Sequence, residues 1–123
     1  MTVFFHSMQA SKIHSKTVLV TGCSSGIGEC VANFLREVGW DVFPTARSES
    51  DLQKLCSNGF DALQLDLNDS ISIDDCVSSL MRKSPLGIGA IVNNAGIAIP
   101  GAVEDLSRDD LLTQFEVNVF GLQ

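Results

Sequence analysis

The chain has 123 residues, of which 45% are hydrophobic and 19% are charged, and its formal net charge is −7. It has the length of one domain and is too apolar for a disordered chain, and its acidity argues against nucleic-acid binding. All of the net negative charge lies in residues 61–123, so an anionic ligand would be repelled less by the first half. The sequence contains seven Phe and one Trp but no Tyr, which excludes any mechanism that needs a phenol within these residues.

Two strand–helix pairs are predicted in the first half of the chain. Residues 17–21 form a β-branched and apolar run closed by a glycine, which is typical of a strand buried on both faces. Apolar residues with helical spacing follow over 26–38 and end at a glycine, a frequent helix stop. A second short strand over 40–45 and a second helix over 48–59 complete this half.

The same alternation continues in the second half. A strand is predicted over 61–65, a helix from Asp69 or Ser70 to Lys83, a strand over 89–93, and a final helix after Ser107. Short strands that alternate with helices indicate βαβ units and a parallel sheet. Right-handed crossovers favour the strand order 3-2-1-4, with a ligand crevice between the first and fourth strands.

The helix ends and the buried helix faces are predicted from residue spacing. Ser48 with Asp51, and Ser107 with Asp110, have the spacing of capping boxes. Apolar side chains that recur every three or four residues are expected to face the sheet. In the first, third and fourth helices these are Ile27, Val31, Phe34, Leu35 and Val38, then Ile73, Val77, Leu80 and Met81, and finally Leu111, Leu112, Phe115, Val119 and Phe120.

Cysteine and histidine usage favours a reducing compartment. The four cysteines have no C-x-x-C spacing and both histidines lie in the first fourteen residues, so no metal site is predicted. We expect buried, reduced thiols and a cytoplasmic location. Residues 1–15 are predicted to be a flexible leader and 16–123 the domain. No run reaches the ~18 apolar residues of a membrane span, so none is expected.

The strongest local signal is the run T-G-C-S-S-G-I-G, which lies directly after the first strand and opens the first helix. A helix N-terminus offers free N–H groups to a phosphate. Gly22 would form the turn, Gly26 would allow close approach of a diphosphate, and Gly28 would allow the helix to pack on the strand. Ser24 and Ser25 can add hydroxyl donors. A merely tight turn would explain one glycine but not three, and the Lys of a P-loop is missing.

A glycine-rich turn between a strand and a helix is typical of dinucleotide-binding sites. The residues at the end of the second strand indicate whether such a site prefers NAD(H) or NADP(H). An NAD site usually places an acid there to bind the ribose hydroxyls. This sequence has Thr45-Ala46-Arg47-Ser48 instead, and a guanidinium can bind a 2′-phosphate with two hydrogen bonds while Ser48 adds a donor. We predict NADP(H) over NAD(H); the alternative is that Arg47 is only an exposed loop base.

Several motifs lie in a characteristic order. They are T-G-x-x-x-G-x-G over 21–28, D-L-N-D over 66–69 after the third strand, N-N-A-G over 93–96, and the isolated Asn118. Over about residues 16–123 the chain therefore resembles the short-chain dehydrogenase/reductase family. The sequence from Arg47 to Leu67 resembles one subgroup of this family, the NADP-linked reductases related to retinol and hydroxysteroid dehydrogenases.

The resemblance implies a Rossmann-type, doubly wound parallel sheet, truncated here to about four strands with flanking helices. Asp66 would accept a hydrogen bond from the adenine amino group, with the Leu67 backbone completing that edge. Asn118 would be the Asn of the family's catalytic tetrad and would position a water. Without the resemblance, Asp66 could be a loop acid and Asn118 a solvent-facing residue. Together with Arg47, which is predicted from its place after the second strand, the expected cofactor-binding residues are Gly22, Ser24, Ser25, Gly26, Ile27, Gly28, Asp66, Leu67, Asn94, Ala95 and Gly96.

Compared with the family it resembles, this sequence lacks part of the catalytic residues. The family's catalytic Ser and its Tyr-x-x-x-Lys pair are missing, since the sequence has no Tyr and its last Lys is Lys83. We expect the N-terminal, cofactor-binding fragment of an NADP(H)-dependent oxidoreductase, inactive alone. The full-length enzyme would be a homo-oligomer that reduces a small carbonyl compound or oxidises an alcohol. A non-catalytic dinucleotide-binding module and a non-functional truncated remnant remain as alternatives.

Overall fold

A four-stranded parallel sheet lies at the centre of residues 15–123, the part of the chain that the computed structural model describes. Its strands are β1 (Thr17–Val20), β2 (Asp41–Ala46), β3 (Leu63–Gln64) and β4 (Ala90–Val92). Their order is β3-β2-β1-β4, so the predicted order is confirmed. In register, Val18 of β1 lies between Val42 of β2 and Ala90 of β4. All three pairings are parallel.

The third strand is much shorter than the five residues predicted. Only Leu63 and Gln64 form it, and they pair with Thr45 and Ala46 at the end of β2. Since β3 is the outer strand on this side of the described sheet, it has a single partner to extend along. Short edge strands are common because they expose few unpaired backbone groups.

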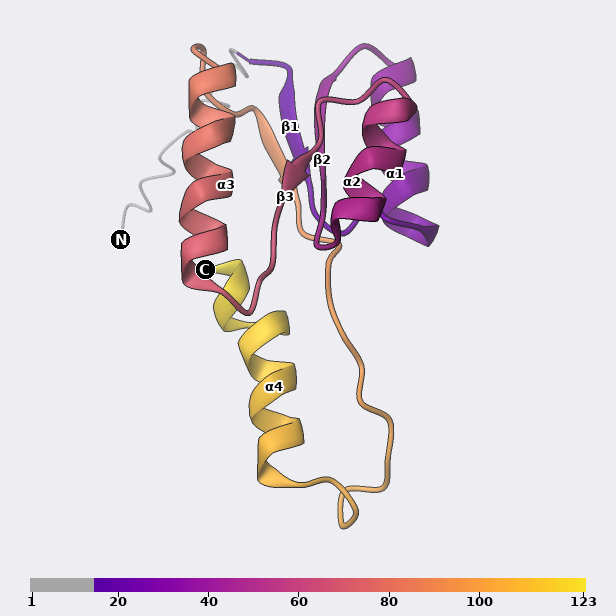
Figure 1. Cartoon of the computed structure of the whole chain (residues 1–123), viewed down its shortest axis with the longest axis vertical. Coiled ribbons are helices and arrows are strands. Elements are labelled where there is room, and N and C mark those ends of the chain that lie inside the picture. The colour runs from indigo at the N-terminus through magenta and orange to yellow at the C-terminus, as the bar shows by residue number, and fades with distance from the viewer. Residues whose placement is uncertain (1–14) are drawn as a thin grey trace, which may run out of the picture.

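Three helices cover the two faces of the sheet. As Figure 1 shows, α1 (Gly26–Glu37) and α2 (Glu49–Ser57) lie on one side and α3 (Ser70–Lys83) lies on the other. Neighbouring residues of β1 accordingly point to opposite faces, as the pleat of a strand requires. Val18 and Val20 pack toward α1 and α2, whereas Leu19 packs with Leu80 of α3.

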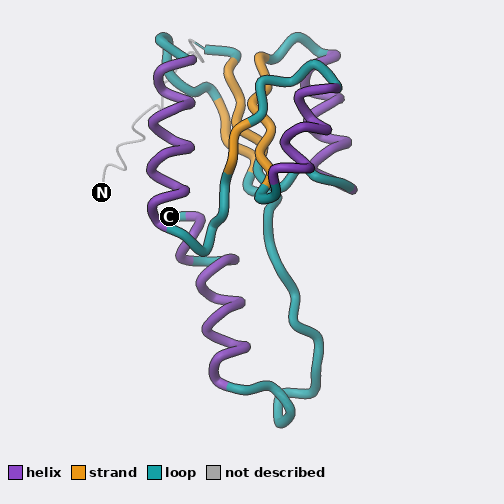
Figure 2. The backbone as a smooth tube through the Cα atoms, in the orientation of Figure 1, coloured by secondary structure: helices purple, strands orange, loops and turns teal. Residues whose placement is uncertain are grey.

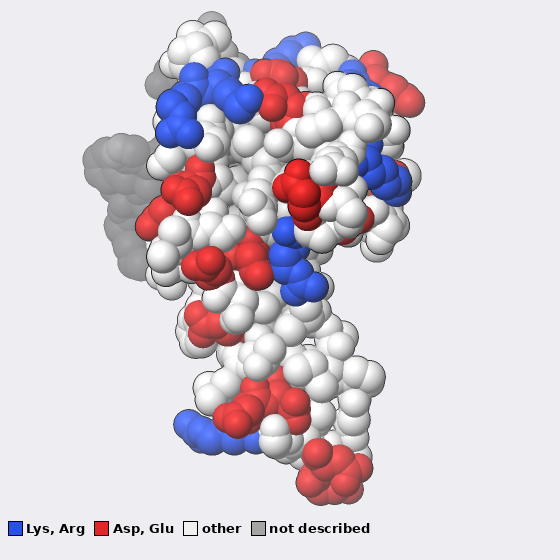
Figure 3. All heavy atoms as spheres, in the orientation of Figure 1, with Lys and Arg blue, Asp and Glu red and all other residues white. Residues whose placement is uncertain are grey.

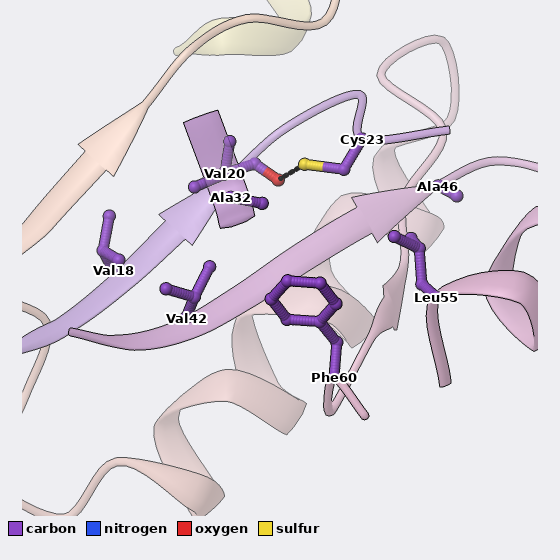
Figure 4. Close-up of a cluster of buried hydrophobic side chains, with 8 residues drawn as sticks. All are labelled: Val18, Val20, Cys23, Ala32, Val42, Ala46, Leu55 and Phe60. Atoms are coloured by element: carbon purple, nitrogen blue, oxygen red, sulfur yellow. Dashed lines mark hydrogen bonds between the residues drawn. The ribbon is translucent and has the colours of Figure 1, made fainter. Parts of the chain in front are cut away.

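Each face has its own buried cluster. The cluster between the sheet and α1 and α2 is drawn in Figure 4 and consists of Val18, Val20, Cys23, Ala32, Val42, Ala46, Leu55 and Phe60. The opposite cluster consists of Leu19, Phe43, Leu63, Leu65, Leu67, Cys76 and Leu80. A sheet buried on both faces explains why the strands are continuous apolar runs rather than alternating ones.

Of the leader predicted over residues 1–15, all but Ser15 lies outside the described residues. Ser15 is buried, and its hydroxyl oxygen accepts a hydrogen bond from the Thr17 N–H at 3.1 Å. The Lys16 carbonyl then accepts one from the Asp41 N–H at 3.0 Å. The described chain is therefore bonded to the sheet from Ser15 onward.

The helix ends show side-chain capping at three of the four α-helices. Ser107 and Asp110 form the complete predicted capping box at the start of α4 (Arg108–Asn118). At α2 the Ser48 hydroxyl accepts from the Asp51 N–H at 3.2 Å, but the Asp51 carboxylate accepts from the Ser48 hydroxyl instead of its backbone N–H. Only half of that predicted box is therefore present.

The predicted helix faces are partly wrong. Leu80 of α3 is fully buried, but Val77 and Met81 are about half exposed, at 46% and 50%. In α1 the fully buried contacts are made by Gly28 and Ala32, whereas Ile27 and Phe34 are mostly exposed, at 76% and 60%. Small residues let a helix approach the sheet closely, and larger neighbours are then displaced to its flanks.

The chain after β4 extends away from the sheet. A long loop runs down to α4, which lies beyond the carboxyl ends of the strands and is followed by the short 3-10 helix η1 (Phe120–Leu122), as Figures 1 and 2 show. The apolar residues expected to be buried in this region are instead exposed, and α4 has no buried residue among those described. They are Leu111, Leu112, Phe115, Val119 and Phe120.

Acidic side chains predominate over α3 and α4 on the face shown in Figure 3. The basic residues of α3, Arg82 and Lys83, lie in its last turn, where they complement the helix dipole. Lys83 also pairs with Asp61 at 2.6 Å. Within residues 15–123 no helix is both long and apolar enough to cross a membrane, and no three His, Cys, Asp or Glu side chains are grouped to hold a metal ion.

Candidate functional site: a dinucleotide cleft at the carboxyl ends of the strands

A cavity of about 370 Å³ lies where the carboxyl ends of all four strands meet. This is the edge at which parallel α/β sheets bind their ligands. The cavity extends from the β3 side across β1 to the β4 side, and is therefore wider than the crevice predicted between β1 and β4. Its lining residues are Gly22, Ser24, Ser25, Ala46, Arg47, Ser48, Asp51, Leu65, Asp66, Leu67, Asn94, Ala95, Gly96, Ile97 and Val117.

Backbone conformation or a close contact requires glycine at three positions of the glycine-rich loop between β1 and α1. Gly22 turns the chain with φ +70°, and a Cβ there would lie 2.8 Å from the Cα of Ala95. Gly26 has φ +63° and open space on its Cβ side, so a ligand can approach it. A Cβ at Gly28 would lie 2.5 Å from the side-chain nitrogen of Asn94, so only glycine allows α1 to begin this close to the loop.

Thr21 and Asn94 tie the end of β1 to the end of β4. The Thr21 hydroxyl oxygen accepts hydrogen bonds from the Asn94 N–H at 3.0 Å and the Ala95 N–H at 2.9 Å. In return, the Asn94 amide nitrogen donates to the carbonyls of Thr21 at 2.8 Å and Gly22 at 2.9 Å. These bonds hold the glycine-rich loop against the start of the loop that follows β4.

Polar groups at the end of β2 line the next part of the cavity. The last residue of the strand is Ala46, and Arg47 and Ser48 follow it, exposed. Within the described residues the Arg47 guanidinium has no hydrogen bond or salt bridge, so it is free to bind an anion. Asp51 also lines the cavity, 2.6 Å from the Ser48 hydroxyl.

The loop between β3 and α3 presents a donor next to an acceptor. Among the described residues the Leu67 N–H has no partner, whereas the neighbouring N–H groups are bonded, namely those of Leu65, Asp66, Asn68 and Asp69. One carboxylate oxygen of Asp66 accepts from the Asn68 N–H at 3.0 Å, and the other is left for a ligand. Asp66 and Leu67 both line the cavity. An amino group beside a ring nitrogen would complement this pair.

Asn118 lies at the last turn of α4 and bonds to the loop after β4. Its side-chain oxygen accepts from the Ile97 N–H at 2.9 Å, and its nitrogen donates to the Ile97 carbonyl at 2.8 Å. One turn earlier, the Gln114 side-chain oxygen accepts from the Ile99 N–H at 3.2 Å. A Cβ at Gly96 would lie 3.0 Å from the Asn118 oxygen, so the glycine permits this close contact.

The structure brings most of the predicted site residues to the cavity. Gly22, Ser24, Ser25, Arg47, Asp66, Leu67, Asn94, Ala95 and Gly96 line it. Gly26, Ile27, Gly28 and Asn118 do not; Ile27 points into solvent, and Asn118 is connected to the cavity through Ile97.

Sequence reasoning missed several lining residues, namely Asp51, Leu65, Ile97 and Val117. Their only sequence signal is that each lies within four residues of a motif position. Thr21 belonged to the motif, but its bonds to the N–H groups of Asn94 and Ala95 depend on the pairing of β1 with β4.

Cys23 is the only thiol within the glycine-rich loop. It is fully buried, and its thiol donates to the Val20 carbonyl at 3.2 Å, the contact dashed in Figure 4. Burial raises the pKa of this thiol from 9.0 to about 11. Because a thiolate is the reactive form, Cys23 packs as a small apolar residue and does not act as a nucleophile.

Comparison with known proteins agrees with this arrangement. The model of the short chain dehydrogenase family matches residues 16–123. YbbO of Escherichia coli strain K12, an uncharacterized oxidoreductase, is 34% identical over 110 residues, which cover 89% of this chain and 41% of the relative. The chain thus spans about two fifths of that relative's length.

Solved structures share the fold. A short-chain dehydrogenase from Streptomyces avermitilis has a TM-score of 0.78 at 33% identity, covering 93% of this chain and 42% of the other. A variant of the actinorhodin polyketide ketoreductase, solved with NADPH, has a TM-score of 0.77 at 31% identity, covering 89% and 44%. With its family model matched from residue 16 onward, the chain belongs to the short chain dehydrogenase family of oxidoreductases.

Proposed function

We propose that this chain is the NADP(H)-binding part of an oxidoreductase that reduces a carbonyl compound or oxidises an alcohol. One observation carries the proposal. The glycine-rich loop, the Asp66–Leu67 pair and the Asn94–Gly96 segment line a single cavity at the carboxyl ends of the strands. A nicotinamide dinucleotide is a long ligand with an anionic centre, and these three elements offer it sites along its whole length.

The diphosphate would bind at the glycine-rich loop, where α1 begins. A helix N-terminus supplies unpaired N–H groups and the positive end of the dipole. Ser25 is the N-cap of α1, yet among residues 15–123 its side chain makes no capping hydrogen bond, so its hydroxyl is available to a phosphate. Glu29 in the first turn would repel an anion, but Lys54 pairs with it at 3.1 Å and offsets its charge.

The adenine would bind at the loop between β3 and α3. Its amino group would donate to the free carboxylate oxygen of Asp66, and its ring nitrogen N1 would accept from the unpaired Leu67 N–H. Donor and acceptor are thus in the order that adenine needs.

The 2′-phosphate would be bound by Arg47 with Ser48. Three observations support NADP(H) over NAD(H): the last residue of β2 is Ala46 rather than an acid, the Arg47 guanidinium has no partner among residues 15–123, and the similar ketoreductase was solved with NADPH. Asp51 lies in the same part of the cavity and opposes a second phosphate charge. Its engagement with the Ser48 hydroxyl limits that effect.

The nicotinamide would lie beside Asn94, Ala95 and Gly96, where small residues leave room for a ring. The bound cofactor would supply the hydride that is exchanged with the substrate. In this chain Asn118 fixes the wall of that region through its two bonds to Ile97. Since the sequence has no Tyr, a phenol that moves the substrate proton would have to come from outside these 123 residues. We therefore propose that the chain alone does not turn over substrate.

Homo-oligomerisation of a full-length enzyme and a cytoplasmic location are part of the same proposal. The exposed apolar side chains of α4, including Leu112 and Phe115, support the first, because exposed apolar surface of this kind favours association. A non-catalytic dinucleotide-binding module is the second candidate function. It is favoured by the lack of Tyr in a sequence that retains the cofactor cleft.

Cofactor titration tests the proposal. NADPH fluorescence should increase and shift when the reduced cofactor binds to the chain, and Asp66→Ala should weaken binding by about tenfold. Asp105→Ala, which removes an exposed acid outside the cavity, serves as the matched control and should leave the affinity unchanged. If the unsubstituted chain binds neither NADPH nor NADH, the cleft is not a dinucleotide site and the proposal fails.

A further inference from the structure

A hydroxyl on α3 holds the loop that is proposed to bind adenine. The oxygen of Ser72 accepts a hydrogen bond from the Asp66 N–H at 2.9 Å. Ser72 lies in the first turn of α3, six residues along the chain, and is half-buried. Its bond therefore connects a regular helix to a loop that carries two ligand groups.

This bond completes the set that fixes the loop. The Leu65 N–H donates to the Ala46 carbonyl at 3.1 Å, which continues the pairing with β2. The Asp69 N–H donates to the Asp66 carbonyl at 3.1 Å, which closes a turn. Between these two bonds, Ser72 is the sole partner of the Asp66 N–H within residues 15–123, so its hydroxyl orients the peptide plane before Asp66. The Asn68 N–H holds one Asp66 carboxylate oxygen at 3.0 Å, but it does not fix this peptide plane.

The orientation of this peptide plane decides where both ligand groups point. The Asp66 side chain leaves the backbone directly after the anchored N–H, and the Leu67 N–H follows one residue later. A rotation about the Asp66 backbone would move the carboxylate and the Leu67 N–H in different directions. Recognition of a base edge needs both at once, since two parallel hydrogen bonds require a fixed spacing.

We propose that Ser72 is a positioning residue for adenine recognition, which rests on the dinucleotide-binding function proposed above. It touches no ligand itself. By holding the Asp66 N–H, it keeps the Asp66 carboxylate and the Leu67 N–H in register with the amino group and N1 of an adenine. The selectivity for adenine over other purines then depends on a hydroxyl that lies behind the site.

Replacing adenine with hypoxanthine provides the test. Hypoxanthine has a carbonyl where adenine has its amino group, and its N1 carries a hydrogen, so both hydrogen bonds would be reversed. The chain should bind NADPH more tightly than the hypoxanthine analogue of NADPH by about tenfold or more, because each mismatch leaves a polar group unpaired. A fixed loop enforces this preference, whereas a loosened loop can adapt to either base.

Three variants of the full chain are compared in this titration. Ser72→Ala should reduce the preference for NADPH over its hypoxanthine analogue by about fivefold, the effect of one lost hydrogen bond. Ser72→Thr retains the hydroxyl and should restore the preference. Ser78→Ala removes an exposed hydroxyl from the same helix and should leave it unchanged. Circular dichroism checks that each variant retains the helix content of the unsubstituted chain.

The possible outcomes are distinct. A loss of preference in Ser72→Ala alone supports the proposal. An equal weakening of both ligands in that variant would mean that Ser72 stabilises the fold without positioning the loop, and would overturn it. If the unsubstituted chain binds both ligands equally, the Asp66–Leu67 pair does not read the base, and the inference fails while dinucleotide binding stands. If it binds neither, the proposed function fails as well.

Discussion

The side-chain amide of Asn118 and the backbone of Ile97 exchange two hydrogen bonds, of 2.9 Å and 2.8 Å. Two residues of an antiparallel ladder exchange a pair of hydrogen bonds in the same way. Gln114, one helical turn earlier, bonds to the Ile99 N–H at 3.2 Å, two residues further along the loop. Two amide side chains of α4 thus form hydrogen bonds with the backbone of residues 97–99, which has no neighbouring strand among the described residues.

The Gln114 bond predicts a change in hydrogen exchange. Gln114→Leu keeps the size of the side chain but removes its acceptor, so the Ile99 N–H should exchange about five- to tenfold faster. Gln114→Glu retains an acceptor oxygen and should preserve the protection. The measurement is amide exchange by NMR, with the Val20 N–H in β1 as the internal reference. Equal exchange at Ile99 in all three proteins would show that this bond does not hold the loop.

The two clusters predict unequal effects for neighbouring residues of α3. Leu80 is fully buried, whereas Met81 is 50% exposed. Leu80→Ala should lower the free energy of unfolding by about 2–5 kcal/mol, since it leaves a cavity among Leu19, Phe43 and Cys76. Met81→Ala should lower it by about 1 kcal/mol or less. Urea denaturation followed by circular dichroism measures both, and equal losses would contradict the arrangement of this helix.

The strands and their order could be predicted because they depend on local patterns. A buried parallel strand is an apolar run whatever it packs against, and crossover handedness then restricts the order. Helix faces were harder to predict. A search for apolar residues at helical spacing selects large side chains such as Phe34. In α1, however, Ala32 is buried against the sheet, and hydrophobicity alone does not distinguish this alanine from an exposed one.

The parts of the site that could be predicted are those whose backbone conformation follows from a short motif. The glycine-rich loop is largely one of them, because Gly22 and Gly26 have positive φ and a Cβ at Gly28 would clash with the carbonyl of Gly22, six residues earlier. Ser72 and Gln114 are not, because a serine or glutamine on a helix has no local sign of its partner. Their roles depend on how a helix is placed against a loop, and that placement is set by the whole sheet.

The thiols are predicted to differ in reactivity. The expectation that the thiols are buried is wrong for Cys30 and Cys56, which are exposed. Cys23 and Cys76 are buried, and burial raises the pKa of both, that of Cys23 to about 11. At pH 8 roughly one Cys23 in a thousand would be ionised at that pKa. Iodoacetamide followed by mass spectrometry should therefore modify Cys30 and Cys56 first. Rapid modification of Cys23 in the folded chain would contradict its burial.

The raised pKa of Cys23 also predicts a pH dependence of stability. The folded state disfavours the thiolate, whereas the unfolded thiol ionises at its ordinary value of 9.0. The contribution of Cys23 to the free energy of unfolding is thus complete below pH 9 and is lost as the pH rises toward about 11. The melting temperature should fall between pH 8 and pH 10, and Cys23→Ala should reduce this fall. An identical fall in the variant would assign it to other groups.

Cofactor preference is predicted to depend on two residues of opposite charge, Arg47 and Asp51, which line the same cavity. Arg47→Asp removes the guanidinium that would bind a 2′-phosphate and adds a repelling charge, so NADPH affinity should fall by about ten- to a hundredfold. NADH lacks that phosphate and should bind as well as before or better.

Asp51→Asn removes a negative charge nearby, and should raise NADPH affinity while leaving NADH binding nearly unchanged. Because the two substitutions act in opposite directions on one ligand, a general loss of folding cannot imitate the result. Parallel titrations of both cofactors at two salt concentrations measure it, since charge effects at exposed groups weaken with salt. An unchanged ratio of NADPH to NADH affinity in both variants would place the 2′-phosphate elsewhere and remove the basis for the preference.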